Sequence, residues 1–112
     1  LYGINVIIGE HVVIGDDVTI ASDVTLGSFM PGMAVIKQPR IGNHVFIGTG
    51  AKILGGVTIG DHCKVAANSV VTRSFRAHRL IAGAPATGMK LAEPSANTDE
   101  AAEYEAATGD EA

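Results

Sequence analysis

A six-residue period runs through most of this chain. Branched aliphatic residues stand at every sixth position between Ile41 and Gly60, at Ile41, Ile47, Ile53 and Ile59. An amphipathic helix repeats its apolar face at i, i+3, i+4 and i+7, and a half-buried strand alternates in twos. Neither has a period of six. The pattern therefore indicates an internal repeat, and a repeat of this kind decides the fold.

Each repeat has the same internal order. Its first place is a branched aliphatic residue, its second is usually Gly, and its fifth is small. The first-place residues are Ile8, Ile14, Ile20, Leu26, Val35, Ile41, Ile47, Ile53, Ile59 and Val65. Three short extended segments joined by corners close a triangular coil of 18 residues, with first-place side chains pointing inward and stacked about 4.8 Å apart. The third and fourth places are often Gly, Asn, Asp or His, which tolerate positive φ. The predicted fold is all-β, a single-domain parallel β-helix.

The repeat is interrupted once. Leu26 and Val35 are nine positions apart instead of six, which predicts three extra residues and a loop over 27–34. Irregular loops on rigid scaffolds often carry function, although a tolerated surface insertion would leave the same pattern.

Two different segments follow the repeats. We expect residues 1–76 to form the β-helix, 77–91 an irregular or partly helical cap, and 92–112 a disordered acidic tail. The formal net charge of −4 is divided unevenly. All eight Lys and Arg residues and five acidic residues precede Glu93, whereas seven acidic residues and no Lys or Arg lie from Glu93 onward. The body is therefore basic and is expected to attract anionic ligands.

Composition narrows the class of protein. With 4% aromatic residues, no Trp and 14 Gly, the interior must be filled by Val, Ile, Leu and Ala, which suits stacked identical layers. No run approaches the roughly 18 apolar residues of a membrane span, and no signal-peptide pattern opens the chain. We expect a soluble cytoplasmic protein with neither membrane nor nucleic acid among its partners. The single Cys63 rules out an intrachain disulfide, and its place in the repeat favours a buried filler over a reactive thiol.

Three histidines occupy the fourth place of their repeats, His11, His44 and His62. His44 and His62 are 18 positions apart, so they are expected to stack one coil from each other. Two imidazoles without a carboxylate or a third histidine make a poor metal site. We therefore expect solvated corner residues and no metal.

Four stretches carry a resemblance to a known family: "VTLGS" at 24–28, "IGTGAKILGGVTIG" at 47–60, "NSVV" at 68–71 and "AGAPA" at 82–86. Over about residues 1–90 the chain resembles the hexapeptide-repeat acyltransferases, and specifically the C-terminal domain of serine O-acetyltransferases. This resemblance implies a left-handed coil, although parallel crossovers are ordinarily right-handed. A homotrimer or a dimer of trimers is also expected, because a short solenoid leaves apolar sides to be covered.

The resemblance implies an activity as well, the transfer of an acetyl group from acetyl-CoA to the hydroxyl of serine on the way to cysteine. A hydroxyl is a weak nucleophile, so a base must take its proton as it attacks. In the family this base is a His three residues before the Gly that matches Gly3, a position that precedes Leu1. We therefore expect no catalytic base in this chain, which is read as a fragment and need not be active alone.

The family's Arg-His-Pro-Lys stretch reads "KQPR" here, which assigns acceptor binding to Lys37, Gln38 and Arg40. Lys37 can pair with a carboxylate as a point charge instead of a fork. Gln38 can form hydrogen bonds but cannot take a proton. The small-molecule hydroxyl acceptor is thus open between serine and a sugar or other small alcohol.

In the family, acetyl-CoA lies in a groove between subunits, with its pantetheine arm passing small residues at one corner of successive coils. The matching third-place residues are Ser28, Thr49 and Ala67, which the hexad count puts on one corner in three consecutive coils. Lys90 and the arginines are expected to meet the CoA phosphates. Small residues also suit corners in the absence of any ligand.

Two further expectations concern partners. Family members that dock onto cysteine synthase end in Ile, whereas this chain ends in "TGDEA", so no such complex is expected. The alternative from another class is a noncatalytic trimeric β-helix that serves as a scaffold.

Overall fold

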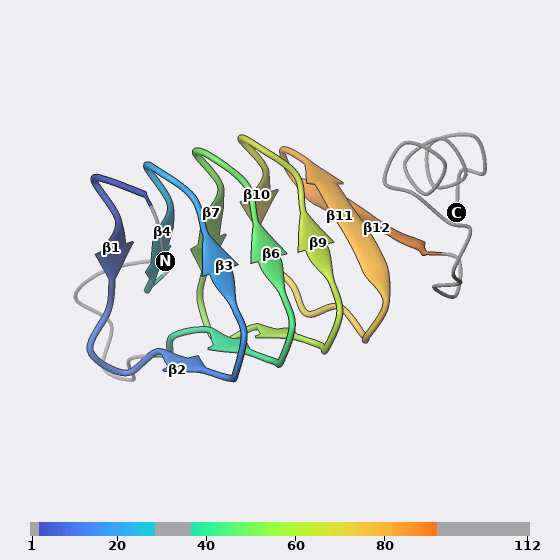
Figure 1. Cartoon of the computed structure of the whole chain (residues 1–112), viewed down its shortest axis with the longest axis horizontal. Coiled ribbons are helices and arrows are strands. Elements are labelled where there is room, and N and C mark those ends of the chain that lie inside the picture. The colour runs from blue at the N-terminus through green and yellow to red at the C-terminus, as the bar shows by residue number, and fades with distance from the viewer. Residues whose placement is uncertain (1–2, 29–36, 92–112) are drawn as a thin grey trace.

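The computed structural model describes residues 3–28 and 37–91, in which short strands wind into a three-sided rod (Figure 1). The strands are β1 (Ile7–Ile8), β2 (Val13–Ile14), β3 (Thr19–Ile20), β4 (Thr25–Gly27), β5 (Arg40–Ile41), β6 (Phe46–Ile47), β7 (Lys52–Leu54), β8 (Thr58–Ile59), β9 (Lys64–Val65), β10 (Val70–Val71), β11 (Arg79–Gly83) and β12 (Ala86–Lys90). Within the described ranges no helix has the length and apolar character needed to cross a membrane.

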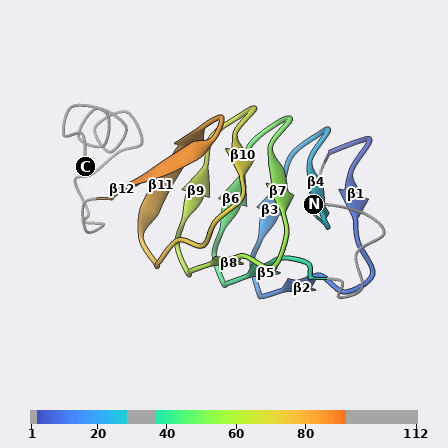
Figure 2. The same ribbon diagram turned by 180° about the vertical axis from the view of Figure 1, so that it is seen from behind.

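Three sheets form the sides of the rod. The first has the order β1-β4-β7-β10, the second β2-β5-β8, and the third β12-β11-β9-β6-β3. Successive strands in the chain lie in different sheets, so the backbone passes from side to side and returns to each sheet one coil later; Figure 2 shows the second sheet from behind. All neighbouring strands are parallel except β11 and β12. The parallel β-helix predicted from the hexads is confirmed, and so is the left-handed coil that the resemblance implies.

The core is built from columns of first-place side chains. Pairing between strands aligns Leu26, Ile53 and Val71 in one column and Ile20, Ile47, Val65 and Ile81 in another. Each of these residues is at most 3% exposed. The fifth places fill the space between the columns with Val45, Ala51, Val57, Cys63 and Ser69, all of them buried. Small residues are needed there because three sides converge on a narrow interior.

Most corners are made by one residue in the left-handed region of φ. The fourth-place residues Asp17, Asp23, His44, His62 and Asn68 have φ between 56° and 61°. Asn, Asp and His are the side chains that adopt this conformation most readily after Gly. The polar residues of the corners are therefore explained by backbone geometry before any ligand is considered.

The loop after β4 is longer than the sequence predicts. Ile14 pairs with Ile41, and Leu26 with Ile53, 27 residues apart in each case, where the coils directly before and after the insertion take 18. The insertion therefore adds nine residues instead of three, and Ile41 is the next first-place residue after Leu26. Val35, which is predicted to open a repeat, lies outside the described residues. Most of the predicted loop over 27–34 lies outside the described residues.

The cap is more regular than the sequence predicts. In place of an irregular or partly helical segment, residues 79–90 form the β11–β12 hairpin, with Arg79 opposite Lys90 and Gly83 opposite Ala86. β11 continues the third sheet by pairing in parallel with β9. Ile81 is fully buried. This strand therefore still supplies an inward aliphatic residue, although its sequence no longer shows the six-residue pattern. The predicted disordered tail, 92–112, lies outside the described residues.

Candidate functional site

The three corners of the rod differ in chemistry. The loop corner joins the first sheet to the second and contains residues 9–11, 55–56 and both ends of the inserted loop. The histidine corner, residues 15–17, 42–44, 60–62 and 76–78, joins the second sheet to the third. The small-residue corner, residues 21–23, 48–50 and 66–68, joins the third sheet back to the first.

The loop corner contains an open hollow. Its volume is about 340 Å³, and it is lined by His11, Lys37, Gln38, Arg40 and Gly56. The three residues predicted to bind the acceptor, Lys37, Gln38 and Arg40, thus lie around one cavity. Gly56 is required beside it, since a Cβ there would stand 2.9 Å from the Cβ of Lys37.

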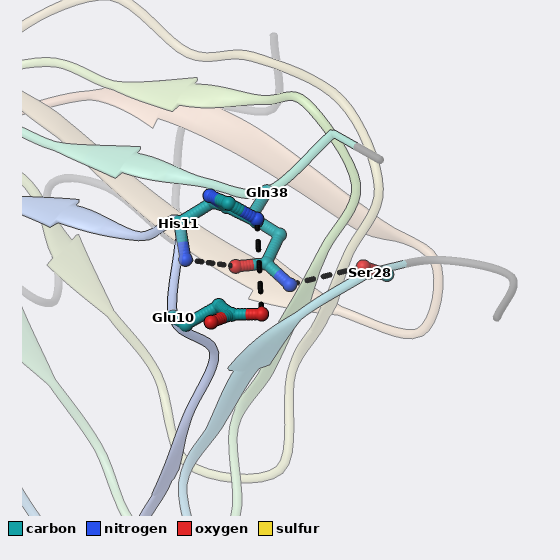
Figure 3. Close-up of polar contacts among 4 residues, drawn as sticks. All are labelled: Glu10, His11, Ser28 and Gln38. Carbon is teal, nitrogen blue, oxygen red and sulfur yellow. Dashed lines mark hydrogen bonds and ion pairs between the residues drawn. The ribbon is translucent and has the colours of Figure 1, made fainter. Parts of the chain in front are cut away.

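Gln38 ties the base of the loop together. Its Oε1 accepts a hydrogen bond from the backbone N–H of His11 at 2.7 Å, and its Nε2 donates to Ser28 Oγ at 3.1 Å (Figure 3). Ser28 precedes the loop and Gln38 follows it, so this one side chain fixes both ends of the insertion to the first coil. Gln38 therefore holds the base of the loop through its amide and also lines the hollow.

His11 enters the hollow from the turn between β1 and β2. Its Nε2 lies 3.9 Å from Glu10 Oε1, too long for a hydrogen bond but close enough for electrostatic attraction when the imidazole is protonated (Figure 3). The two side chains are 57% and 84% exposed. The sequence predicts that His11 is a solvated corner residue. Its proximity to Gln38 becomes visible only once the loop is known to add nine residues.

Two of the predicted cofactor residues lie together on the small-residue corner. Ile47 pairs with Val65, so Thr49 lies beside Ala67, and the carbonyl of Thr49 accepts a hydrogen bond from Asn68 N–H at 2.8 Å. Both side chains are exposed. The residue one coil before them is Ser22, whose carbonyl accepts from Gly50 N–H at 2.9 Å.

Ser28 does not belong to this column. Leu26 pairs with Ile53, which puts Ser28 beside Gly55 on the loop corner. The prediction that Ser28, Thr49 and Ala67 share a corner is therefore wrong, because it assumed that the loop adds three residues. An insertion of nine residues is one repeat longer than an insertion of three, so every position before the loop moves by one side of the triangular coil. Ser22 therefore takes the position that was assigned to Ser28.

Lys90 lies away from both groups. It pairs with Arg79 at the start of the hairpin, next to the histidine corner, where Leu91 N–H donates to the carbonyl of His78 at 2.9 Å. The small-residue corner meets the opposite end of β11. The four residues predicted to bind the cofactor thus occupy three different corners of one chain.

The histidine corner holds a stack of three imidazoles. The rings of His44 and His62 stack with centroids 4.8 Å apart, as predicted, and His78 extends the stack at 5.0 Å from His62. His44 Nδ1 lies 3.5 Å from Asp17 Oδ2. Nowhere in residues 3–28 and 37–91 do three or more metal-ligating side chains gather in a way that could hold an ion.

Cys63 is expected to be unreactive in the folded chain. The residue is fully buried, its Sγ donates to the carbonyl of Arg76 at 3.0 Å, and burial raises the pKa of the thiol above its usual 9.0. Because the thiolate is the nucleophile, an aromatic disulfide reagent at pH 8 should modify Cys63 only after urea unfolds the chain. Rapid modification without urea would contradict this burial.

The same burial gives a dependence of stability on pH. A pKa raised in the folded state means that stability is present in full below the ordinary pKa of the thiol and is lost as pH rises through the folded value. Urea unfolding should therefore show a larger loss of stability between pH 8 and pH 10 in the natural chain than in Cys63→Ala. Equal losses in both would contradict the expectation.

Comparisons with known proteins agree with this architecture. Residues 38–73 match the family described as "Bacterial transferase hexapeptide (six repeats)". A comparison with curated protein sequences finds no match.

Several solved structures share the fold. A serine acetyltransferase in complex with cysteine is 36% identical, with a TM-score of 0.73 over 79% of this chain and 36% of that one. The enzyme from Neisseria gonorrhoeae is 34% identical, with a TM-score of 0.76 over 88% of this chain and 39% of that one. The serine acetyltransferase of Brucella abortus strain S19 in complex with coenzyme A is 39% identical, with a TM-score of 0.70 over 75% of this chain and 33% of that one.

The chain spans between 33% and 39% of the length of these structures. The family match and the solved structures agree with the six-residue repeat and with the three-sided coil. The chain thus has a hexapeptide-repeat fold and resembles the hexapeptide-repeat acyltransferases, the serine acetyltransferases in particular.

Proposed function

We propose that this chain is part of an acetyl-CoA-dependent O-acetyltransferase and that serine is its leading acceptor. The observation that carries the proposal is the match of most of the chain to serine acetyltransferases at 34–39% identity, one of them solved with coenzyme A and another with cysteine. The hollow and the small-residue corner supply the features that such a reaction needs.

The small-residue corner is suited to a pantetheine arm. Thr49 and Ala67 are exposed and carry small side chains on adjacent coils, so an extended chain can approach the backbone along them. Ser22 continues the column in the preceding coil. In the proposal acetyl-CoA runs along this corner as the co-substrate, and no metal takes part.

The hollow is suited to the acceptor. Lys37 and Arg40 are exposed cations on its wall, and either can pair with a carboxylate. In the reaction the acceptor hydroxyl forms a new bond to the acetyl carbonyl carbon, the bond from that carbon to sulfur breaks, and CoA leaves as the thiol. The base that takes the hydroxyl proton is proposed to be a histidine preceding Leu1 in the complete protein.

A homotrimer would complete the site, either alone or as a dimer of trimers. Large apolar side chains are exposed on all three sides of the rod, with Ile7 63%, Val13 47% and Phe46 41% accessible. Packing of neighbouring rods would bury such surfaces. It would also bring different corners of adjacent subunits together, which is how Lys90 can share a seam with Thr49. The proposal includes no complex with cysteine synthase, and it places the protein in the cytoplasm.

A second candidate is an O-acetyltransferase of a sugar or other small alcohol. The observation that favours it is Gln38, which cannot take a proton and is held by Ser28 and the backbone of His11. A noncatalytic scaffold is the remaining alternative.

Turnover by the complete protein tests the proposal. The protein is incubated with acetyl-CoA and serine, and the free thiol of released CoA is followed with an aromatic disulfide reagent. Serine-dependent release supports the leading function, whereas release with a sugar and not with serine supports the second. Absence of release with every acceptor, by a folded protein, would overturn both enzymatic readings.

A further inference from the structure

One end of the rod carries charge of a single sign. Residues 62–92 contain five basic residues and no acidic one, whereas residues 1–61 contain three basic and five acidic residues. Four of the five basic residues lie in the segment 72–78 and in the β11–β12 hairpin, which close the rod (Figure 1). We call these four residues the cationic end: Arg73, Arg76, Arg79 and Lys90.

The described part of the chain supplies no counter-charge to the cationic end. The ion pairs found within residues 3–28 and 37–91 join His11 to Glu10 and His44 to Asp17, and neither includes a residue of this end. The acidic residue that precedes it in the chain is Asp61. Its Oδ1 accepts a hydrogen bond from Asn43 N–H at 2.7 Å, so this carboxylate is engaged by the preceding coil.

Two of the four cations face each other across the hairpin. Arg79 lies directly opposite Lys90 in the antiparallel pair, and like charges in this arrangement are destabilising. Arg79 Nη1 donates to the carbonyl of Ala77 at 2.8 Å, which holds the guanidinium beside the histidine corner. Lys90 is exposed. An anion bound between these two side chains would relieve their repulsion.

The other two cations are exposed and lie close to the hairpin. The guanidinium of Arg73 is 4.7 Å from the centroid of the Phe75 ring. The same ring lies against Gly88 of β12, where an added Cβ would stand 2.6 Å from it. Phe75 thus holds Arg73 next to the hairpin, while Arg76 is exposed at the histidine corner.

We propose that the acidic segment that follows, residues 93–112, binds the cationic end of its own chain and shields it from other anions. This segment contains seven acidic residues and no Lys or Arg. The contact would be an autoinhibitory one, because a foreign anion would have to displace the segment before it could bind. The inference is independent of the proposed function, since it requires neither acetyl-CoA nor an acceptor.

The covalent chain keeps the two sets of charges within reach of each other. Glu93 follows Lys90 by three residues, a span of at most about 11 Å. Because both sets belong to one molecule, their effective concentration is on the order of millimolar. A single exposed ion pair is weak, but several carboxylates can meet four cations at once. The contact should therefore form at low salt and be lost at high salt.

Paramagnetic relaxation in NMR spectra detects such a contact. A nitroxide is attached to Ala106→Cys in the isotope-enriched full chain, where the added thiol alone should react because Cys63 is fully buried. We expect the label to broaden the amide signals of Arg76 and Lys90 at about 20 mM NaCl, and much less at about 500 mM, where the Debye length is short. The amide signal of Gly9, in the first coil, should be unaffected.

The matched control is a neutral segment of the same length with the same label. Its seven acidic residues are replaced by amides: Glu93→Gln, Asp99→Asn, Glu100→Gln, Glu103→Gln, Glu105→Gln, Asp110→Asn and Glu111→Gln. The tether is unchanged, so broadening in excess of this control measures attraction between charges. The excess should disappear in the double variant Arg76→Gln/Lys90→Gln. It should persist in Lys37→Gln/Arg40→Gln, which removes the same charge from the loop corner.

The affinity for a small anion gives the second readout. Inorganic pyrophosphate is titrated by calorimetry into the natural chain and into the chain with the neutral segment, both at about 20 mM NaCl. If the acidic segment covers the cationic end in about 90% of the molecules, pyrophosphate should bind the natural chain about tenfold more weakly.

Three results would overturn the inference. The first is equal broadening by the natural and neutral segments, and the second is equal affinity of the two chains for pyrophosphate. The third is broadening that arises only between a labelled molecule and a separate isotope-enriched one, since the segment would then bind a neighbouring chain instead of its own.

Discussion

Replacing Thr49 with Trp should weaken CoA binding by about 100-fold, or ~2.8 kcal/mol. Thr49 is exposed on the small-residue corner, and the next rung of that corner, Ala67, is one strand spacing away, about 4.8 Å. An indole ring at position 49 is large enough to lie across both rungs and prevent a pantetheine arm from reaching the backbone. Calorimetric titration of the natural chain and the variant measures the difference.

The matched control is Ser28→Trp. It adds the same ring to another small residue of the predicted cofactor set, but one that the register puts on the loop corner beside Gly55. If the arm follows the small-residue corner, Ser28→Trp binds CoA as the natural chain does. Sedimentation of each variant must give the same mass, because a lost trimer would also weaken binding. Loss of binding in Ser28→Trp with none in Thr49→Trp would move the cofactor to the loop corner.

Replacing Ile59 with Ala should lower the free energy of unfolding by about 3 kcal/mol, within the range for truncation of a buried Ile. Ile59 is fully buried, pairs with Ile41 in the preceding coil and forms a bridge to Phe75 in the next. Its side chain therefore supports the rungs on either side, and truncation leaves a cavity that stacked strands cannot close easily. Urea unfolding followed by circular dichroism gives the value.

Thr58→Ala is the control for this substitution. Thr58 is the neighbouring residue of β8, and its side chain is exposed, so the change removes little buried surface. We expect a loss within about 0.5 kcal/mol, the usual range for a surface position. Comparable losses at the two positions would mean that the alternation of buried and exposed residues in this strand has been assigned wrongly.

The fold could be predicted from the sequence because each place of the six-residue repeat corresponds to a fixed position on one side of the coil. First-place aliphatic residues such as Ile47 and Ile53 point into the core because the coil turns that position inward in every repeat. His62 and Asn68 occur at the fourth place because the corner requires the left-handed φ that each adopts. The cap was harder, since one inward Ile81 in a five-residue strand has no period to reveal it. Only its partner strand, β12, shows that the segment is a hairpin.

The site was predicted less well, and for one reason. The residues around Val35 resemble a repeat, so the sequence predicts a loop six residues too short and assigns Ser28 to the wrong corner. Long-range pairing of Leu26 with Ile53 is what corrects the count, and nothing local signals it. The same error concealed His11, because its place beside Gln38 depends on where the chain re-enters the coil.

The β11–β12 hairpin at the end of the third sheet affects whether two rods can stack end to end. At the other end of the rod, β1 presents a parallel edge, and the first-place Ile8 is still 41% exposed. A second rod could continue the coil only by offering a parallel edge in matching register. The antiparallel β12, which ends at the exposed Lys90, offers none on the third sheet. Head-to-tail fibres of this chain are therefore disfavoured, and association is directed to the sides of the rod.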